Sequence, residues 1–268
     1  MGARMRVRDF NDKTVYLVGG SSGIGLAAAR MLAREGSDVM VFARGRGRLE
    51  AAVDDFIDAL RRRRNPVFSL PADGSLDDGH LDHSLNVCLI SLVLGEARRY
   101  NHVDLQKLGL GAILHDVGKV ALPHPDAQAS ADPLRAHPEI GYEFLRARYD
   151  LSILAAHVAF QHHEHLDGSG YPRGLRGNAI HEFGALAAVA NTCEHLLAGG
   201  RDPAGAVARL KAMAGSQLDA DLVAQALRRI ALYPVGTIVA LGDGDIAVVT
   251  GQTPDAARPR VRLVADAD

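Results

Sequence analysis

The stretch "LGLGAILHDVGKV", Leu108 to Val120, places a histidine and an aspartate, His115 and Asp116, within an apolar run. Apolar residues recur there at spacings of three and four, which predicts a helix that continues through both residues. A buried carboxylate without a partner costs several kcal/mol, so Asp116 needs a cation or dense hydrogen bonding. Lys119 follows His115 by one helical turn on the same face and could neutralise Asp116 alone. A metal ion is the alternative.

Further histidines favour the metal ion. Four of them lie on or beside apolar helical faces: His83, His137, His162 and His163. One such histidine is usually a satisfied core residue, but five together with an aspartate are better explained by a metal, since imidazole and carboxylate suit Fe, Mn or Zn. The last two open the segment "HHEHLDGSGYP", where glycines indicate a sharp turn. A polar surface loop rich in histidine is the competing interpretation of that segment.

The surrounding region, from about residue 76 to residue 232, is predicted to be mostly helical. Five segments show apolar residues at helical spacing, beginning near residues 80, 104, 137, 150 and 184. Antiparallel helices of this kind form a bundle, and bundles place metal sites between facing helices. The motifs above therefore predict a metal site inside a helical bundle.

The order of these motifs resembles the HD-GYP family of cyclic-dinucleotide phosphodiesterases. The segments "HSLNV", "ILHDVGKV", "HPEIG" and "HHEHLDGSGYPRGL" carry the match. The resemblance implies a bundle that binds two divalent ions, Fe or Mn, and hydrolyses cyclic di-GMP to pGpG and GMP through metal-activated water. In the implied site Asp116 bridges the two ions and Lys119 contacts the scissile phosphate. The implied ligands are His83, His115, Asp116 and position 191 for one ion, and His137, His162 and His163 for the other. The implied substrate loop contains Gly168, Gly170, Tyr171 and Pro172.

The chain departs from the family pattern at position 191. The family has an aspartate there, and this chain has Asn191, whose amide oxygen is neutral and a weaker ligand. We therefore expect the ion at His137 to be bound well and the other ion poorly, unless Glu194 compensates from nearly the same helical face. Gly79 stands where some members have an acid, which argues against a third metal. A regulatory or nucleotide-binding module without turnover is the second hypothesis.

The pattern of the N-terminal region predicts a fold other than a helical bundle. Strand-like and helix-like segments alternate from about Asp12 to Asp73, as in a parallel α/β unit. The stretch beginning "LVGGSSGIG" resembles the short-chain dehydrogenase/reductases, with Gly19, Gly23 and Gly25 as the dinucleotide motif. The resemblance implies that Arg44 holds the 2′-phosphate of NADP. The catalytic Tyr-x-x-x-Lys of that family is absent, so an NADP-binding oxidoreductase is the third hypothesis, and a tight turn that binds nothing is the plainer one.

The last region, from Tyr233 to Asp268, has the alternation of short strands around a "GDGD" turn. It resembles the small β extension that follows many HD-GYP domains. The expected fold is thus multidomain, α/β plus all-α: a half-Rossmann unit at 1–73, an HD-type helical bundle at 74–232 and a small β element at 233–268.

Composition limits the remaining choices. Of 268 residues, 47% are hydrophobic and 23% are charged, as in an ordinary globular protein. A net charge of −2 gives no reason to expect a DNA partner. Two cysteines, Cys88 and Cys193, are too few for a disulfide framework and fit a reducing cytoplasm, and no apolar run reaches the roughly 18 residues of a membrane span. The expected partners are a cyclic dinucleotide and either signalling proteins or a second copy of the chain.

Overall fold

The structure is a computed structural model that describes residues 14–18, 38–42, 46–62, 68–69, 79–121, 133–148, 151–197, 202–233, 235–242, 244–253 and 257–264. The chain forms two compact units, Met1–Arg62 and Arg63–Asp268. None of the helices within the described ranges combines the length and apolar character needed to cross a bilayer.

The described residues of the first unit form a small parallel sheet and the helix α2. Strands β1 (Thr14–Val18) and β2 (Asp38–Phe42) pair in parallel, as an α/β unit requires. Helix α2 (Arg46–Arg62) follows, with buried apolar side chains four residues apart, such as Val53 and Ile57. The residues of the expected dinucleotide motif, Gly19, Gly23, Gly25 and Arg44, lie outside the described residues.

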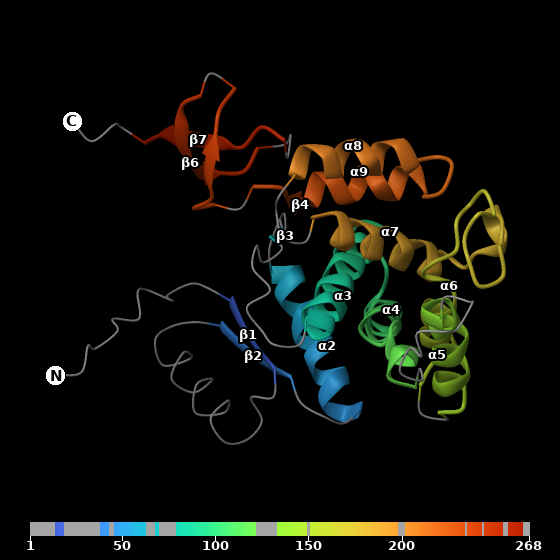
Figure 1. The fold of residues 1–268 in the computed structure, drawn as a ribbon. Coiled ribbons are helices and arrows are strands. Elements are labelled where there is room, and N and C mark those ends of the chain that lie inside the picture. Colours follow the sequence, from blue (N-terminus) through green and yellow to red (C-terminus); the bar gives the residue numbers. More distant parts are fainter. Residues whose placement is uncertain are drawn as a thin grey trace. The chain divides into compact units, whose positions relative to one another are not determined.

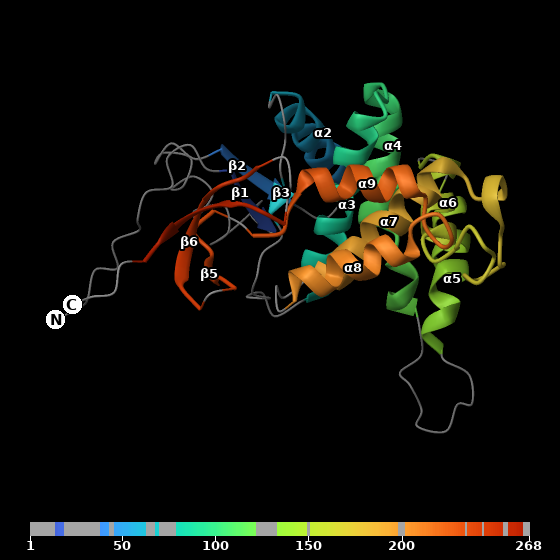
Figure 2. The same ribbon diagram turned by 90° about the horizontal axis from the view of Figure 1, so that it is seen from above.

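The second unit is built around a helical bundle (Figure 1). Its helices are α3 (Gly79–Ala97), α4 (His102–Ile113), α5 (His137–Arg146), α6 (Ile153–Gln161), α7 (Glu182–Leu197), α8 (Pro203–Met213) and α9 (Ala220–Arg229). Helix α3 packs against α4 and α7, and α6 packs against α4, α5 and α7. Helices α8 and α9 pack against each other and against α7, and they lie on the side of α7 that faces the viewer in Figure 2.

Local sequence explains where several of these helices begin and how closely they pack. Asn101 and Asp219 cap α4 and α9, each accepting a backbone N–H three residues later at 2.9 and 2.8 Å. A Cβ at Gly111 would lie 2.8 Å from the side chain of Val158, so this glycine allows α4 and α6 to approach closely. This close contact helps to position α6 and the residues at its end.

The structure corrects the expectation that His115 and Asp116 lie inside a helix. Helix α4 ends at Ile113, and the two residues lie in a turn before the 3-10 helix η1 (Val117–Ala121). The backbone N–H groups of Val117 and Lys119 bond to carbonyls three residues earlier, which replaces the α-helical pattern. Apolar spacing alone does not distinguish a helix from a helix followed by such a turn.

Two small β elements complete the unit. Strand β3 (Phe68–Ser69) pairs in parallel with β4 (Ile230–Ala231). It therefore does not extend the sheet of β1 and β2. Strands β5 (Ile238–Ala240), β6 (Ile246–Gly251) and β7 (Arg260–Leu263) form an antiparallel sheet in that order. The predicted helical bundle with a C-terminal β element is confirmed.

Candidate metal centre

The carboxylate of Asp116 lies between two groups of histidines. His83 comes from α3, His115 and Asp116 from the turn after α4, His137 from the first residue of α5, and His162 and His163 from the end of α6. In each of the groups His83–His115–Asp116 and His137–His162–His163, the atoms able to bind a metal lie within 4.8 Å of one another. Five of the histidines predicted from sequence are therefore brought together.

Each oxygen of Asp116 faces a different group. Its Oδ2 lies 3.6 Å from His83 Nε2 and 3.4 Å from His115 Nε2. Its Oδ1 lies 3.1 Å from His137 Nε2 and 3.7 Å from His162 Nε2. A carboxylate placed in this way can serve two cations at once.

The hydrogen bonds on the far side of each ring fix the tautomers of four histidines. The Nδ1 atoms of His115 and His162 bond to the carbonyls of Ala112 and Ala159, at 2.7 and 2.8 Å, and His137 Nδ1 bonds to the Leu134 carbonyl. His83 Nδ1 bonds to Glu194 Oε2 at 2.6 Å. Oxygen acceptors of this kind carry no proton, so each Nδ1 is the donor and each neutral ring has a lone pair on Nε2.

These lone pairs face one another in two pairs. His83 Nε2 lies 3.1 Å from His115 Nε2, and His137 Nε2 lies 3.1 Å from His162 Nε2. When both rings of a pair are neutral and carry their proton on Nδ1, no proton lies between the two Nε2 atoms, and their lone pairs repel. A cation coordinated by both nitrogens removes that repulsion, and ring orientation by an outer hydrogen bond is typical of metal-bound histidine. The donor set therefore fits a divalent metal.

The charges in the site suit the same role. Burial and the neighbouring histidines keep the pKa of His162 well below its usual range, and burial lowers the pKa of His163 to about 3. Burial alone would raise the pKa of Asp116, but the close rings of His115, His137 and His162 together outweigh it and hold that pKa below its usual range. The site thus offers an ionised carboxylate and, at His162 and His163, imidazoles that are held neutral.

Lys119 contacts this carboxylate, as its position one turn from His115 suggested. Its Nζ donates to Asp116 Oδ2 at 2.5 Å, and its side chain is 27% exposed. One ammonium group can balance the charge of Asp116, but it leaves the facing Nε2 lone pairs unexplained. The lysine alone does not account for the site.

Asn191 and Glu194 lie on α7 and have different surroundings. Asn191 is buried, and among the described residues its Oδ1 has no hydrogen-bond partner. Glu194 lies behind His83, since its Oε2 accepts from Nδ1, and its Oε1 also accepts from Asn86 at 3.4 Å. Burial raises the pKa of Glu194, but the hydrogen bond from His83, the charge of that ring and the hydrogen bond from Asn86 together hold the pKa below its usual range. Glu194 therefore orients His83 and stays ionised there.

The glycine-rich loop packs directly on the second group of histidines. Tyr171 donates its backbone N–H to the His163 carbonyl at 3.0 Å, and its ring stacks on the His163 ring with centroids 4.5 Å apart. A Cβ at Gly170 would collide with the backbone of His163 and His165, and Gly168 has a φ of +78°. The Tyr171–Pro172 peptide bond is cis. The loop is thus joined to a candidate ligand through both backbone and ring.

Sequence reasoning gave no role to Glu164, which holds this loop in shape. Its side chain is buried, and its two oxygens accept the backbone N–H groups of Arg173 and Leu175, each at 2.8 Å. The sequence shows only that Glu164 is an acid between histidines. Its role could not be predicted, because its partners are backbone N–H groups, which nearly every residue supplies.

Fold and site together define a helical metal-binding domain with a histidine–aspartate centre. The chain belongs to the HD domain family, whose model matches residues 76–222. The model for short chain dehydrogenases matches residues 13–77. Both resemblances expected from the sequence are confirmed, and membership of the HD domain family implies binding of divalent metal ions.

Several curated proteins are similar to this chain. The cyclic di-GMP phosphodiesterase PA4108 of Pseudomonas aeruginosa is 29% identical over 212 residues, which are 75% of this chain and 51% of that protein. The cyclic di-GMP phosphodiesterase response regulator RpfG of Xanthomonas campestris is 36% identical, over 35% of this chain and 27% of that protein. The 3′3′-cGAMP-specific phosphodiesterase 2 of Vibrio cholerae is 40% identical, over 31% of this chain and 17% of that protein. The chain spans about half the length of PA4108 and less of the other two.

A solved structure has the same fold. Bd1817, an HDG"Y"P protein from Bdellovibrio bacteriovorus, superposes with a TM-score of 0.54 at 20% identity, over 66% of this chain and 60% of that one.

Proposed function

We propose that this protein is a metal-dependent phosphodiesterase that hydrolyses a cyclic guanine dinucleotide such as cyclic di-GMP. One observation carries the proposal: two pairs of histidines turn their Nε2 atoms toward each other, and the ionised carboxylate of Asp116 lies between the two pairs. The curated relatives named as phosphodiesterases of cyclic dinucleotides support the substrate class.

The proposed ligands follow the two groups of histidines. One ion would be held by His83, His115, Asp116 and Asn191, and the other by Asp116, His137, His162 and His163. Two bound divalent ions, Fe or Mn in this proposal, would supply a water of lowered pKa and positive charge beside the phosphate oxygens. The unpartnered Oδ1 of Asn191 supports its inclusion, because an unsatisfied buried oxygen costs about 1–3 kcal/mol.

The chain's own residues would orient and stabilise the reacting phosphate. Lys119 is partly exposed and already lies beside Asp116, so its ammonium group can stabilise the negative charge that develops on the scissile phosphate. The loop of Gly168, Gly170, Tyr171 and Pro172 would form the wall of the substrate pocket. Its anchoring by Glu164 fixes that wall relative to His163.

A second candidate function is a nucleotide-binding module without turnover. The neutral Asn191 at a proposed ligand position favours it, since an amide attracts a cation less than a carboxylate does. Binding of NADP through Gly19, Gly23, Gly25 and Arg44 remains a prediction, because these residues lie outside the described ranges.

The wider context is also part of the proposal. We propose the boundaries 1–73, 74–232 and 233–268 for its parts, and signalling proteins or a second copy as partners. Cys88 and Cys193 are free and buried, and burial raises the pKa of both thiols to about 12. Free thiols support the reducing cytoplasm expected from the sequence.

One experiment separates these functions. The full chain is purified without oxygen, its metal content is measured, and it is incubated with Mn or Fe(II) and either cyclic di-GMP or 3′3′-cGAMP. Formation of pGpG and GMP, abolished by chelation and by His115→Ala, is the expected result. Tight binding without product would favour the regulatory module, and oxidation of NADPH with a carbonyl substrate would favour the third hypothesis.

A further inference from the structure

An exposed arginine lies over the ring of the tyrosine in the proposed substrate loop. Arg135 lies in the 3-10 helix η2 (Pro133–Ala136), directly before α5. Its guanidinium carbon is 4.4 Å from the centroid of the Tyr171 ring. The same ring also stacks on the ring of His163, so Tyr171 contacts both a candidate metal ligand and a cation.

The segment that carries Arg135 is itself tied to the candidate metal centre. The carbonyl of Leu134 accepts the hydrogen bond from His137 Nδ1. Arg135 is therefore connected to the group of His137, His162 and His163 in two ways. The backbone of the neighbouring Leu134 bonds to His137, and the ring of Tyr171 contacts both Arg135 and His163. Its position depends on the same contacts that orient His137 and His163.

This contact differs from the other arginine–aromatic contacts among the described residues. Arg146, Arg148 and Arg173 lie 5.8 to 5.9 Å from their ring centroids, and Arg146 also pairs with Glu143 at 2.6 Å. Arg135 is closer to its ring, and no ion pair engages it within the described parts of the chain. A guanidinium stacked through its face keeps the N–H groups at its rim free to donate.

We propose that Arg135 binds the phosphate of the cyclic dinucleotide that is not cleaved, an inference that rests on the proposed function. Lys119 and the histidine groups surround Asp116, where the scissile phosphate would lie, whereas Arg135 contacts the Tyr171 ring and makes no ion pair with Asp116 among the described residues. A cyclic dinucleotide carries two phosphodiesters, so a second anion must be held when the first reaches the metals. The planar guanidinium can hold it with two parallel hydrogen bonds without leaving the ring.

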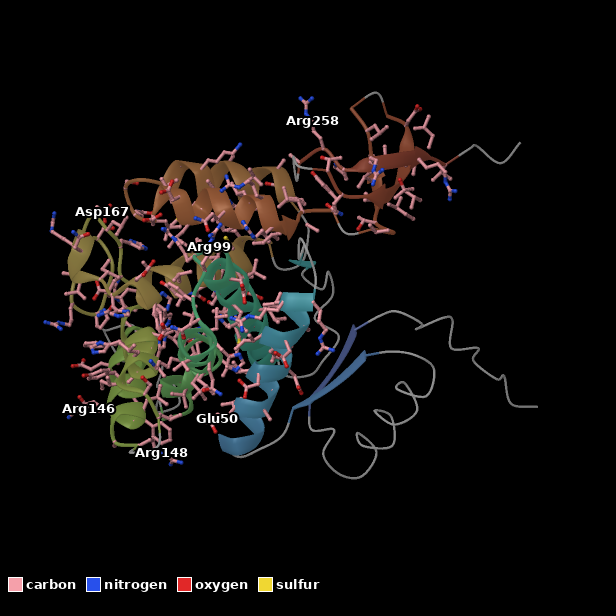
Figure 3. All side chains as sticks on the ribbon, turned by 180° about the vertical axis from the view of Figure 1, so that it is seen from behind. Glu50, Arg99, Arg146, Arg148, Asp167 and Arg258 are labelled. Carbon is pink, nitrogen blue, oxygen red and sulfur yellow. The ribbon has the colours of Figure 1, made fainter. Side chains whose placement is uncertain are left out.

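The test compares Arg135→Ala and Arg135→Lys with the control Arg148→Ala. Arg148 is also an arginine over an aromatic ring, and Figure 3 shows it at the opposite end of the α5–α6 pair from the loop that carries Asp167. Binding of cyclic di-GMP is measured by calorimetry on chelated protein, so that no turnover is required. Metal content, KM and kcat are then measured with Mn.

We expect Arg135→Ala to raise Kd and KM about tenfold, as loss of a charged hydrogen-bonding group does, with kcat within about twofold and metal content unchanged. The binding of this variant should also depend less on ionic strength. Arg135→Lys should recover part of the loss, since it keeps the charge but not the paired geometry, and Arg148→Ala should match the parent.

Unchanged Kd and KM in Arg135→Ala would overturn the inference, and so would a loss of metal, which would give Arg135 a structural role. A parent protein that binds cyclic di-GMP without hydrolysing it would remove the proposed function and leave the Kd comparison decisive for Arg135. A parent that neither binds nor hydrolyses it would overturn both.

Discussion

Replacing Glu194 by glutamine tests the metal centre through the residue that orients His83. The Glu194 carboxylate accepts the Nδ1 proton of His83 at 2.6 Å, and both side chains are about nine-tenths buried, with 12% and 8% exposure. This bond leaves the His83 lone pair on Nε2, opposite His115. Glutamine has nearly the same shape but no charge, and its NH₂ end can stabilise only the wrong tautomer, with the proton on Nε2.

The size of the effect follows from this geometry. Outer hydrogen-bond partners of metal-bound histidines typically contribute 10- to 100-fold in metal affinity, which is about 1.4–2.7 kcal/mol. The loss should fall on the ion at His83, His115 and Asp116. The ion at His137 should keep its affinity, because among the described residues Glu194 does not contact that group and reaches it only through His83 and Asp116.

Titration of the chelated protein with Mn, followed by calorimetry, measures both sites. Glu143→Gln is the matched control, since Glu143 is an exposed acid paired with Arg146, and surface pairs contribute little. If Glu194→Gln binds both ions as tightly as the parent, or if both ions weaken equally, the proposed relay from Glu194 through His83 is wrong.

Three further predictions concern charge, packing and pH. Asn191→Asp is expected to raise metal content toward two ions per chain and to increase the phosphodiesterase rate; if elemental analysis and product formation both stay unchanged, position 191 is not a ligand. Gly118→Ala is expected to destabilise the protein by about 1–3 kcal/mol and to lower its metal content, because a Cβ there would collide with the His137 carbonyl; an unaltered thermal midpoint would contradict this packing. In chelated protein, the free energy of unfolding should fall as the pH drops from 6.5 toward 3, because His162 and His163 are held neutral when folded and gain protons on unfolding. The unfolded state binds more protons in this window, so the slope should reach about 1.4 kcal/mol per pH unit for each histidine, and urea titrations with a flat profile would refute it.

The helices and the gathering of histidines could be predicted because both depend on local patterns. Spacings of three and four mark α3, α6 and α7, and motif order brings His83 toward His115 once the helices pack. The end of α4 could not be predicted, since its apolar spacing continues past Ile113 while the backbone changes to bonds between residues three apart.

Contacts made by backbone groups, or between segments far apart in the chain, leave no pattern in the amino-acid sequence and could not be predicted from it. Glu164 binds two backbone N–H groups, and the pairing of Phe68–Ser69 with Ile230–Ala231 joins two-residue strands more than 150 residues apart. Arg135 is an ordinary exposed arginine in the sequence. Only the fold brings it onto Tyr171.

The pairing of β3 with β4 also bears on how such a domain can be moved between proteins. The strand before the helical bundle and the strand after it are hydrogen-bonded neighbours, about 4.8 Å apart, so the chain enters and leaves the bundle at one place. Domains whose two ends lie together tolerate insertion into another chain, because the host backbone need not stretch to accommodate them. A graft of residues 68–231 into a surface loop of an unrelated protein would therefore carry the whole histidine cluster. The two ends of the graft would be separated by only the distance between two paired strands.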